Sequence, residues 1–196
     1  MNVLIVGGHN VFVSQLIEKF NKEGWEVYLL TGSKNPTHRH HYVFEQYDFP
    51  YDTDSIKEII DSAAPDLVLF TGAYDSNLSS GKGRRESMYY MSSLVNVLMA
   101  SQMLKVPKFV YISSHEVYEE SYADPITEDM APSPLSTKGM MVAQGENLVT
   151  RYGDTTQMDT YVFRLDHMYW MPKNRKEVGE VHGKLCLEAL RNHKVP

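Results

Sequence analysis

Short, uninterrupted apolar runs that alternate with helical patterns constrain the fold of this 196-residue chain more than any other feature. An apolar residue at every position is typical of a strand that is buried on both faces, as in a parallel sheet. A helical pattern between two such runs predicts a right-handed crossover connection. We predict six strands, at residues 3–6, 26–30, 42–47, 67–70, 108–112 and 159–165.

Apolar residues at three- and four-residue spacing predict the helices between these strands. We expect Asp54 or Ser55 to cap the second helix, and Ser133 with Pro134 to begin the fourth. The predicted helices span residues 11–22, 54–64, 86–104, 133–152 and 180–192. Alternating strands and helices predict an α/β fold with a doubly wound parallel sheet that helices cover on both faces.

Small and polar residues stand where the predicted strands end. In a doubly wound sheet, ligands bind at the carboxyl ends of the strands. We therefore expect one crevice, formed by the strand ends Gly7-Gly8, Thr31, Asp48, Thr71-Gly72-Ala73, Ser113-Ser114 and Asp166-His167.

The charge balance and the absence of long apolar runs exclude several classes of protein. The net charge is −6, with 19 Lys and Arg against 25 Asp and Glu, which argues against a nucleic-acid partner. No run approaches the roughly 18 apolar residues of a membrane span, and the first residues lack a basic leader. We predict a cytoplasmic protein.

Cysteine and histidine give no sign of a metal or redox site. Cys186 is the single cysteine, which excludes an intrachain disulfide and a CxxC motif. The run His38-Arg39-His40-His41 lacks the spacing of a metal centre, and we interpret it as a solvated loop. We predict no metal.

Six segments, in chain order, resemble one known family. The segment V-G-G-H-N-V-F-V is similar to a glycine-rich cofactor loop, and K-F-V-Y-I-S-S-H-E-V-Y is similar to the fifth strand with its catalytic Ser or Thr. The other four are Asp48-Phe49, F-T-G-A-Y, I-T-E-D-M-A-P-S-P-L-S and R-L-D-H-M-Y-W. The chain thus resembles an extended short-chain dehydrogenase/reductase of the NAD-dependent epimerase/dehydratase family.

The resemblance implies a Rossmann domain over residues 1–165 that binds NAD(P), and a truncated substrate-binding region that starts at residues 166–196. It implies a small-molecule substrate, a nucleotide sugar or a similar compound. The candidate substrate-binding residues are Ser114, His115, Asp166 and His167, with loop capping as the alternative role of Asp166 and His167. The implied cofactor-binding residues are Gly7, Gly8, Asn10, Phe12, Val13, Thr31, Ser33, Lys34, Asp48, Phe49, Thr71, Gly72 and Ala73.

The catalytic motif departs from the family pattern. The family has a tyrosine that moves the proton and, four residues later, a lysine that lowers its pKa; here these positions hold Lys138 and Val142. The catalytic candidates are therefore Ser114, which would polarise the reacting group, and Lys138, which would need desolvation to act near neutral pH. Two hypotheses stay open: an enzyme with atypical or lost catalysis, and a non-catalytic binding, regulatory or assembly module.

The cofactor loop also departs from the family pattern. Asn10 and Val13 stand where the family has its second and third glycines, and we expect Val13 to push its helix outward or to require a smaller neighbour. No acid follows the second strand, where Ser33, Lys34 or Arg39 could receive a 2′-phosphate. This favours NADP over NAD, with a solvated polar loop as the alternative.

Methionine is abundant, with 11 residues, many of them on the two long helices. Methionine fills core gaps and also suits adaptable interfaces. Core packing and a homodimer face, which the resemblance implies for these helices, are both open.

Overall fold

The computed structural model describes residues 1–8, 11–31, 45–48, 53–72, 83–118 and 125–166. These residues belong to the compact unit Met1–Asp166. The predictions for the helix at 180–192 and for residues 42–44 of the third strand lie outside the described residues.

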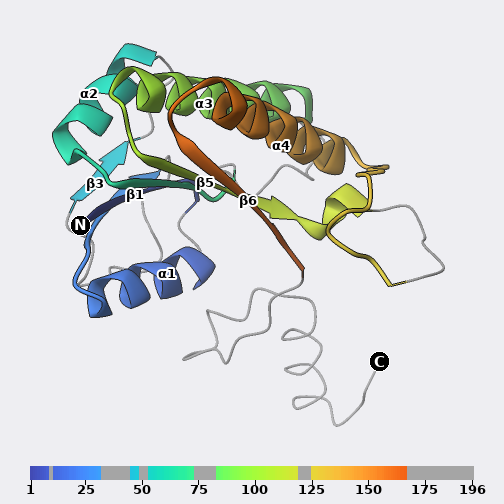
Figure 1. Ribbon diagram of the computed structural model, residues 1–196, viewed down its shortest axis with the longest axis horizontal. Coiled ribbons are helices and arrows are strands. Elements are labelled where there is room, and N and C mark those ends of the chain that lie inside the picture. Colours follow the sequence, from blue (N-terminus) through green and yellow to red (C-terminus); the bar gives the residue numbers. More distant parts are fainter. Residues whose placement is uncertain (9–10, 32–44, 49–52, 73–82, 119–124, 167–196) are drawn as a thin grey trace, which may run out of the picture. The chain divides into compact units, whose positions relative to one another are not determined.

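A six-stranded, fully parallel sheet forms the centre of this unit (Figure 1). Its spatial order is β3-β2-β1-β4-β5-β6, which confirms the predicted doubly wound topology. The strands are β1 (Asn2–Val6), β2 (Glu26–Thr31), β3 (Glu45–Asp48), β4 (Leu67–Phe70), β5 (Lys108–Ser114) and β6 (Asp159–Leu165).

Helices cover both faces of the sheet, as predicted. Helix α1 lies on one face, while α2, α3 and α4 lie on the other (Figure 1). Their bounds are α1 (Val11–Lys22), α2 (Thr53–Ala63), α3 (Gly83–Met103) and α4 (Thr137–Thr155), and a short 3-10 helix, η1 (His115–Tyr118), follows β5. The sequence predicted no helix at η1.

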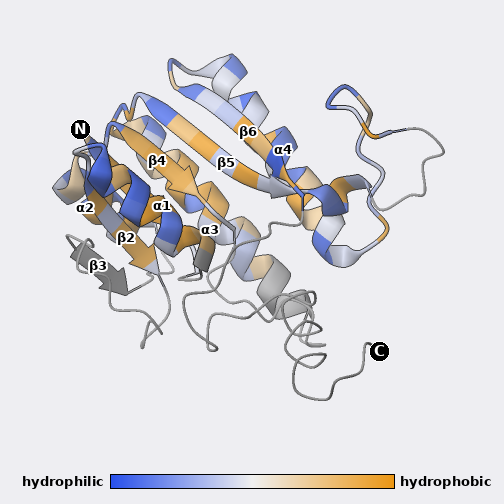
Figure 2. Ribbon diagram, turned by 90° about the horizontal axis from the view of Figure 1, so that it is seen from below, coloured by the Kyte–Doolittle hydropathy of each residue, from blue (hydrophilic) through white to orange (hydrophobic). Residues whose placement is uncertain are grey.

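The strands carry the most apolar residues, and they supply two cores, one on each face of the sheet (Figure 2). On β1, Val3 and Ile5 belong to the core under α1, while Leu4 and Val6 belong to the core under α2, α3 and α4. This division follows from the two-residue period of a strand. It explains why the run has no polar position.

Three predicted helix starts are wrong, and one of them is that of α3, which begins at Gly83 and not at residue 86. Helix α4 begins at Thr137, because the Ser136 hydroxyl accepts a hydrogen bond from the Gly139 amide at 2.9 Å and caps it. The Ser133 amide instead donates to the Val117 carbonyl at 2.8 Å, which ties this segment to η1. Helix α2 begins at Thr53, so Asp54 and Ser55 lie inside its first turn.

Candidate functional site

The carboxyl ends of β1, β2 and β4 meet at one level of the sheet. Val6 is in register with Leu30 on one side and with Phe70 on the other. The next residues, Gly7, Thr31 and Thr71, therefore lie side by side, as predicted. The chain leaves β1 toward α1 on one face of the sheet and leaves β4 toward α3 on the other (Figure 1), which is the strand arrangement where doubly wound sheets bind their ligands.

Gly7 allows the backbone to close against β4. Its φ is +143°, a conformation that side-chain-bearing residues rarely adopt, and a Cβ here would collide with the Thr71 hydroxyl. The Gly7 amide donates to the Leu30 carbonyl at 3.0 Å. Thr71 donates twice to the Val6 carbonyl, from its amide at 2.9 Å and from its hydroxyl at 3.1 Å.

The other described cofactor candidates surround this turn. Gly8 is half-buried, and Gly72 also has a positive φ of +108°. Thr31 is fully buried, and its register partner on β3 is Asp48. The first turn of α1 holds no acidic side chain, so no carboxylate of that turn neutralises the positive end of the helix dipole.

Val13 faces the core. It is fully buried in the cluster that contains Val3, Ile5 and Ile17, and Phe12 packs against the same cluster. The branched side chain thus fills space between α1 and the sheet, beside residues that are themselves medium-sized and aliphatic. Six predicted site residues lie outside the described residues: Asn10, Ser33, Lys34, Phe49, Ala73 and His167.

Glu116 connects the two catalytic candidates. Ser114, half-buried at the end of β5, accepts a hydrogen bond on its Oγ from the Glu116 amide at 3.2 Å. The Glu116 carboxylate binds Lys138 Nζ at 2.5 Å, and the Lys138 side chain is 45% exposed. Lys138 is therefore a paired surface lysine, and burial, the condition for its acid/base role, is absent.

Val142, the other replaced position, faces the core. It is buried, and its backbone carbonyl accepts a hydrogen bond from the Tyr111 hydroxyl at 3.2 Å. Tyr111 also shares a hydrogen bond with Tyr90. Burial raises the pKa of both phenols well above their ordinary value, so both stay protonated near neutral pH.

A partly buried ion pair joins α4 to β6. The Glu146 carboxylate on α4 accepts bonds from Arg164 Nε at 3.0 and 3.2 Å and from Arg164 Nη2 at 2.8 Å. The Ser113 hydroxyl donates to the same carboxylate. The hydrogen bonds that Arg164 donates to this carboxylate raise the pKa of Arg164 above its ordinary value. Arg164 Nη1 also donates to the Tyr118 hydroxyl and, at 3.1 Å, to the Glu128 carbonyl.

A cavity of about 310 Å³ opens beside η1. Two predicted substrate residues, His115 and Asp166, line it, with their Nδ1 and Oδ1 atoms 3.7 Å apart. Tyr118, Arg164 and residues 126–128 complete its wall. The structure thus brings Ser114, His115, Lys138 and Asp166 to one end of the site, around η1.

Sequence reasoning missed the roles of Glu116, Glu146 and Arg164. Glu146 follows Lys138 and Val142 at four-residue spacing, which places a carboxylate on the buried face of α4. Arg164 is a charge that directly follows three apolar or aromatic residues of its strand, Tyr161 to Phe163. A charged group that is removed from water needs a partner of opposite charge. An acid on the buried face of a helix and an arginine on a strand could therefore have been paired from the sequence.

The described residues contain no group of three or more His, Cys, Asp or Glu that could hold a metal ion. None of the helices in these residues is long and apolar enough to cross a membrane. The run His38 to His41 lies outside the described part of the chain.

Comparison with known proteins identifies the family. The family model described as NAD dependent epimerase/dehydratase family matches residues 3–195. The chain therefore belongs to the NAD-dependent epimerase/dehydratase family, as the motifs predicted. A search of curated proteins found no match.

Solved structures of this kind share the fold. The UDP-glucose 4-epimerase of Thermotoga maritima, solved with UDP-glucose, is 20% identical with a TM-score of 0.85, covering 97% of this chain and 63% of that one. The Thermus thermophilus UDP-glucose 4-epimerase, solved with NAD, is 20% identical with a TM-score of 0.79, covering 96% and 61%.

A dTDP-glucose 4,6-dehydratase from Bacillus anthracis, solved with NAD, is 16% identical with a TM-score of 0.81, covering 100% of this chain and 63% of that one. This chain thus spans a little over 60% of the length of these similar structures.

Proposed function

We propose that the chain binds a nicotinamide dinucleotide in the crevice between β1 and β4, and a nucleotide sugar or similar compound in the adjoining site around η1, with atypical or lost catalysis. The observation that carries this proposal is the turn at Gly7. A positive φ, a backbone packed against Thr71 and an adjacent helix start without acidic residues form a cradle that suits a pyrophosphate.

The described crevice residues fit the cofactor, because glycines stand where its pyrophosphate would lie against the backbone. Gly7 and Gly8 would let the pyrophosphate approach the chain, and Gly72 would leave room beside it. Asn10, Phe49 and Ala73 are assigned to the same site from the sequence. When bound, the nicotinamide supplies hydride transfer.

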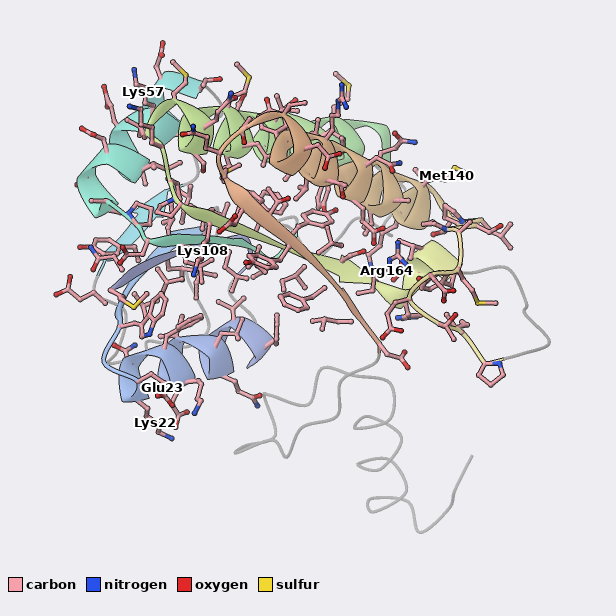
Figure 3. The ribbon with its side chains drawn as sticks, in the orientation of Figure 1. Lys22, Glu23, Lys57, Lys108, Met140 and Arg164 are labelled. Atoms are coloured by element: carbon pink, nitrogen blue, oxygen red, sulfur yellow. The ribbon has the colours of Figure 1, made fainter. Side chains whose placement is uncertain are left out.

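NADP is the form that we propose the chain prefers. Support comes from the sequence after β2, where Thr31 is followed by Gly32, Ser33 and Lys34 and no acid is present. A 2′-phosphate gains a charge-assisted hydrogen bond from a lysine, whereas an unmodified ribose does not need one. Lys34→Gln should weaken NADPH binding about three- to tenfold and leave NADH binding unchanged, while Lys22→Gln, on the outer side of α1 (Figure 3), should change neither.

We propose Ser114 as the residue that polarises a substrate hydroxyl or carbonyl. Its Oγ lies at the carboxyl end of β5 and accepts a hydrogen bond of 3.2 Å from the Glu116 amide. Within the described part of the chain its hydroxyl hydrogen has no acceptor, so we propose that it is donated to a substrate oxygen. Lys138 stands at the position of the proton-transfer tyrosine. To act there, it would have to leave Glu116.

The Lys138 to Glu116 ion pair favours the second candidate function, a non-catalytic binding, regulatory or assembly module. A lysine that is held by a carboxylate and open to water lacks the burial that an acid/base role for this residue would require. In this reading the cofactor crevice still binds its dinucleotide. The two readings differ in turnover and agree on binding.

A homodimer through α3 and α4 belongs to the proposal. Exposed methionines and a tyrosine occupy the outer surfaces of these helices: Met88, Tyr89, Met99, Met103 and Met140. Met140 lies on the side of α4 away from the sheet (Figure 3). Such a methionine-rich surface suits an adaptable interface, and sedimentation of the purified chain would detect the dimer.

The remaining parts of the proposal rest on the sequence. We propose that residues 166–196, His167 among them, begin a substrate-binding region, and that residues 1–165 form the dinucleotide-binding domain. A cytoplasmic location is proposed from the single cysteine, which is typical of a reducing compartment.

Calorimetric titration with NADPH, NADP⁺, NADH and NAD⁺ tests the proposal. We expect micromolar binding of at least one. Gly8→Asp should abolish it, because a carboxylate there would face the pyrophosphate. Gln102→Glu adds the same charge at the exposed end of α3 and should not affect binding. Absence of binding to wild type at millimolar concentration, or equal binding by Gly8→Asp, contradicts the cofactor site.

A further inference from the structure

The size of the cavity beside η1 restricts its ligand. At about 310 Å³ it lies at the lower end of the roughly 300–1,000 Å³ of small-molecule pockets. It can hold a single ring more readily than a whole nucleotide. His115, which directly follows Ser114, lines it, so a ring bound there would lie close to the catalytic candidate.

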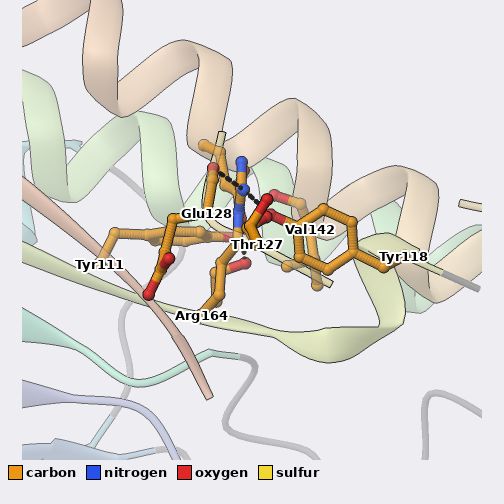
Figure 4. A network of polar contacts seen from close by, with 8 residues as sticks. Tyr111, Tyr118, Thr127, Glu128, Val142 and Arg164 are labelled. Atoms are coloured by element: carbon orange, nitrogen blue, oxygen red, sulfur yellow. Dashed lines mark hydrogen bonds and ion pairs between the residues drawn. The ribbon is translucent and has the colours of Figure 1, made fainter. Parts of the chain in front are cut away.

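The polar wall of the cavity is held in place by Arg164. Its guanidinium lies 4.9 Å from the centre of the Tyr118 ring and donates to the Tyr118 hydroxyl and to the Glu128 carbonyl. The Tyr118 hydroxyl donates in turn to the Thr127 carbonyl at 3.4 Å (Figure 4). A wall fixed in this way loses little entropy when a ligand binds.

The side chains that line the cavity carry positive and negative charges in unequal number. The positive charge of Arg164 is matched by the buried carboxylate of Glu146. Two acidic residues, Glu128 and Asp166, also line the cavity, and both are exposed. His115, 3.7 Å from Asp166, adds a positive charge only when protonated. Negative charge therefore exceeds positive charge in the lining.

We infer that this cavity binds the sugar ring of the substrate and selects neutral or amino sugars over sugars that carry a carboxylate. The inference rests on the proposed function, because it assigns the sugar end of the nucleotide sugar to this site. Carboxylates and carbonyls accept hydrogen bonds from sugar hydroxyls, and the Tyr118 ring and Ile126 offer apolar surface to the ring carbons. A ligand carboxylate would be repelled, and an ammonium group attracted.

Isoleucine methyl NMR on the purified chain provides the test. Ile126 lines the cavity and is half exposed, so its methyl signal, assigned through Ile126→Val, reports occupancy. The probes are glucosamine, glucose and glucuronate. Glucosamine should bind about threefold or more tightly than glucose, and glucuronate about threefold or more weakly, as expected for charges at a partly exposed site.

Matched variants identify the source of this selectivity. Glu128→Gln combined with Asp166→Asn should bring the three dissociation constants within about twofold of each other, because both carboxylates are then neutral. Glu58→Gln removes the same kind of charge from the exposed face of α2 and should preserve the order. Selectivity that survives the double variant contradicts the assignment to these carboxylates.

Nucleotide sugars separate this inference from the proposed function. UDP-glucosamine, UDP-glucose and UDP-glucuronic acid should bind in the same order as the free sugars. If the free sugars shift Ile126 in the expected order and no UDP-sugar binds, the proposed function fails and the cavity assignment holds. No shift of Ile126, equal affinities, or tightest binding of glucuronate overturns the inference, whatever the UDP-sugars do.

Discussion

The crevice between β1 and β4 and the site around η1 lie at the same edge of one sheet, yet they are built differently. The crevice is formed by backbone: glycines with positive φ and amides that pair with neighbouring strands. The η1 site is formed by charged side chains: Glu116 with Lys138, and Glu146 with Arg164. A backbone cradle can keep its shape while nearby side chains change. In this chain, the departures from the family's catalytic motif fall in the η1 site, which is built from side chains.

The ion pair at Arg164 should give the largest effect. Arg164→Met would leave the buried Glu146 carboxylate without its cation, and we expect a loss of about 3 kcal/mol in the free energy of unfolding. Adding Glu146→Leu should recover more than half of it, because the uncompensated charge is then removed. Urea denaturation measures both, and a single-variant loss below about 1 kcal/mol would show that the pair behaves as a surface pair.

The turn at Gly7 tests how closely the backbone packs in the crevice between β1 and β4. Gly7→Ala should cost about 2 kcal/mol or more, from backbone strain and from the collision with Thr71. Gly24→Ala is the matched control, since Gly24 also has a positive φ (+79°) but has no atom within 4 Å of the added Cβ. It should cost about 1 kcal/mol. Equal losses at the two glycines would contradict close packing at the crevice.

Alkaline pH should weaken the fold through Tyr90 and Tyr111. Their pKa values are raised by burial, so the folded chain keeps protons that the unfolded chain releases above a pH of about 10. Stability present below that pH is then lost as pH rises, by up to about 1.4 kcal/mol per pH unit for each tyrosine.

The check is urea denaturation between pH 9 and 11.5 for wild type and Tyr111→Phe. The variant should show a shallower loss than wild type, since one of the two titrating phenols is absent. Parallel slopes would mean that the Tyr111 phenol titrates as it does in the unfolded chain.

Breaking the ion pair between Lys138 and Glu116 should have the smallest effect on the free energy of unfolding. Lys138→Met should change the free energy of unfolding by less than about 1 kcal/mol, because the pair is partly exposed to water. Glu116→Gln should have a similar small effect. A loss comparable to that of Arg164→Met would show that the ion pair supports the fold of η1.

Much of the fold could be predicted from the sequence because buried parallel strands leave an unmistakable pattern. The run from Val3 to Val6 predicted β1, and the register then brought Gly7, Thr31 and Thr71 together. Helix starts were less predictable, since Ser133 and Ser136 are both good caps and only the hydrogen bond that the Ser133 amide donates to the Val117 carbonyl decides between them.

The candidate site could be predicted only in part. Positions at strand ends follow from topology, which explains why Ser114 and Asp166 were placed correctly at the sheet edge. Ion pairs between elements that are distant in the sequence depend on three-dimensional contact. Nothing at Lys138 itself indicates Glu116, which lies 22 residues away, and Glu146 and Arg164 are 18 residues apart.

The most direct test asks whether dinucleotide binding in the crevice is independent of the charged side chains around η1. Wild type and Lys138→Ala would be titrated side by side by calorimetry with the dinucleotide that binds best. The account predicts micromolar binding at one site per chain, with dissociation constants that agree within about threefold, because the cradle is made of backbone at β1 and β4. No binding to either chain, or a tenfold weaker affinity in Lys138→Ala, would contradict it.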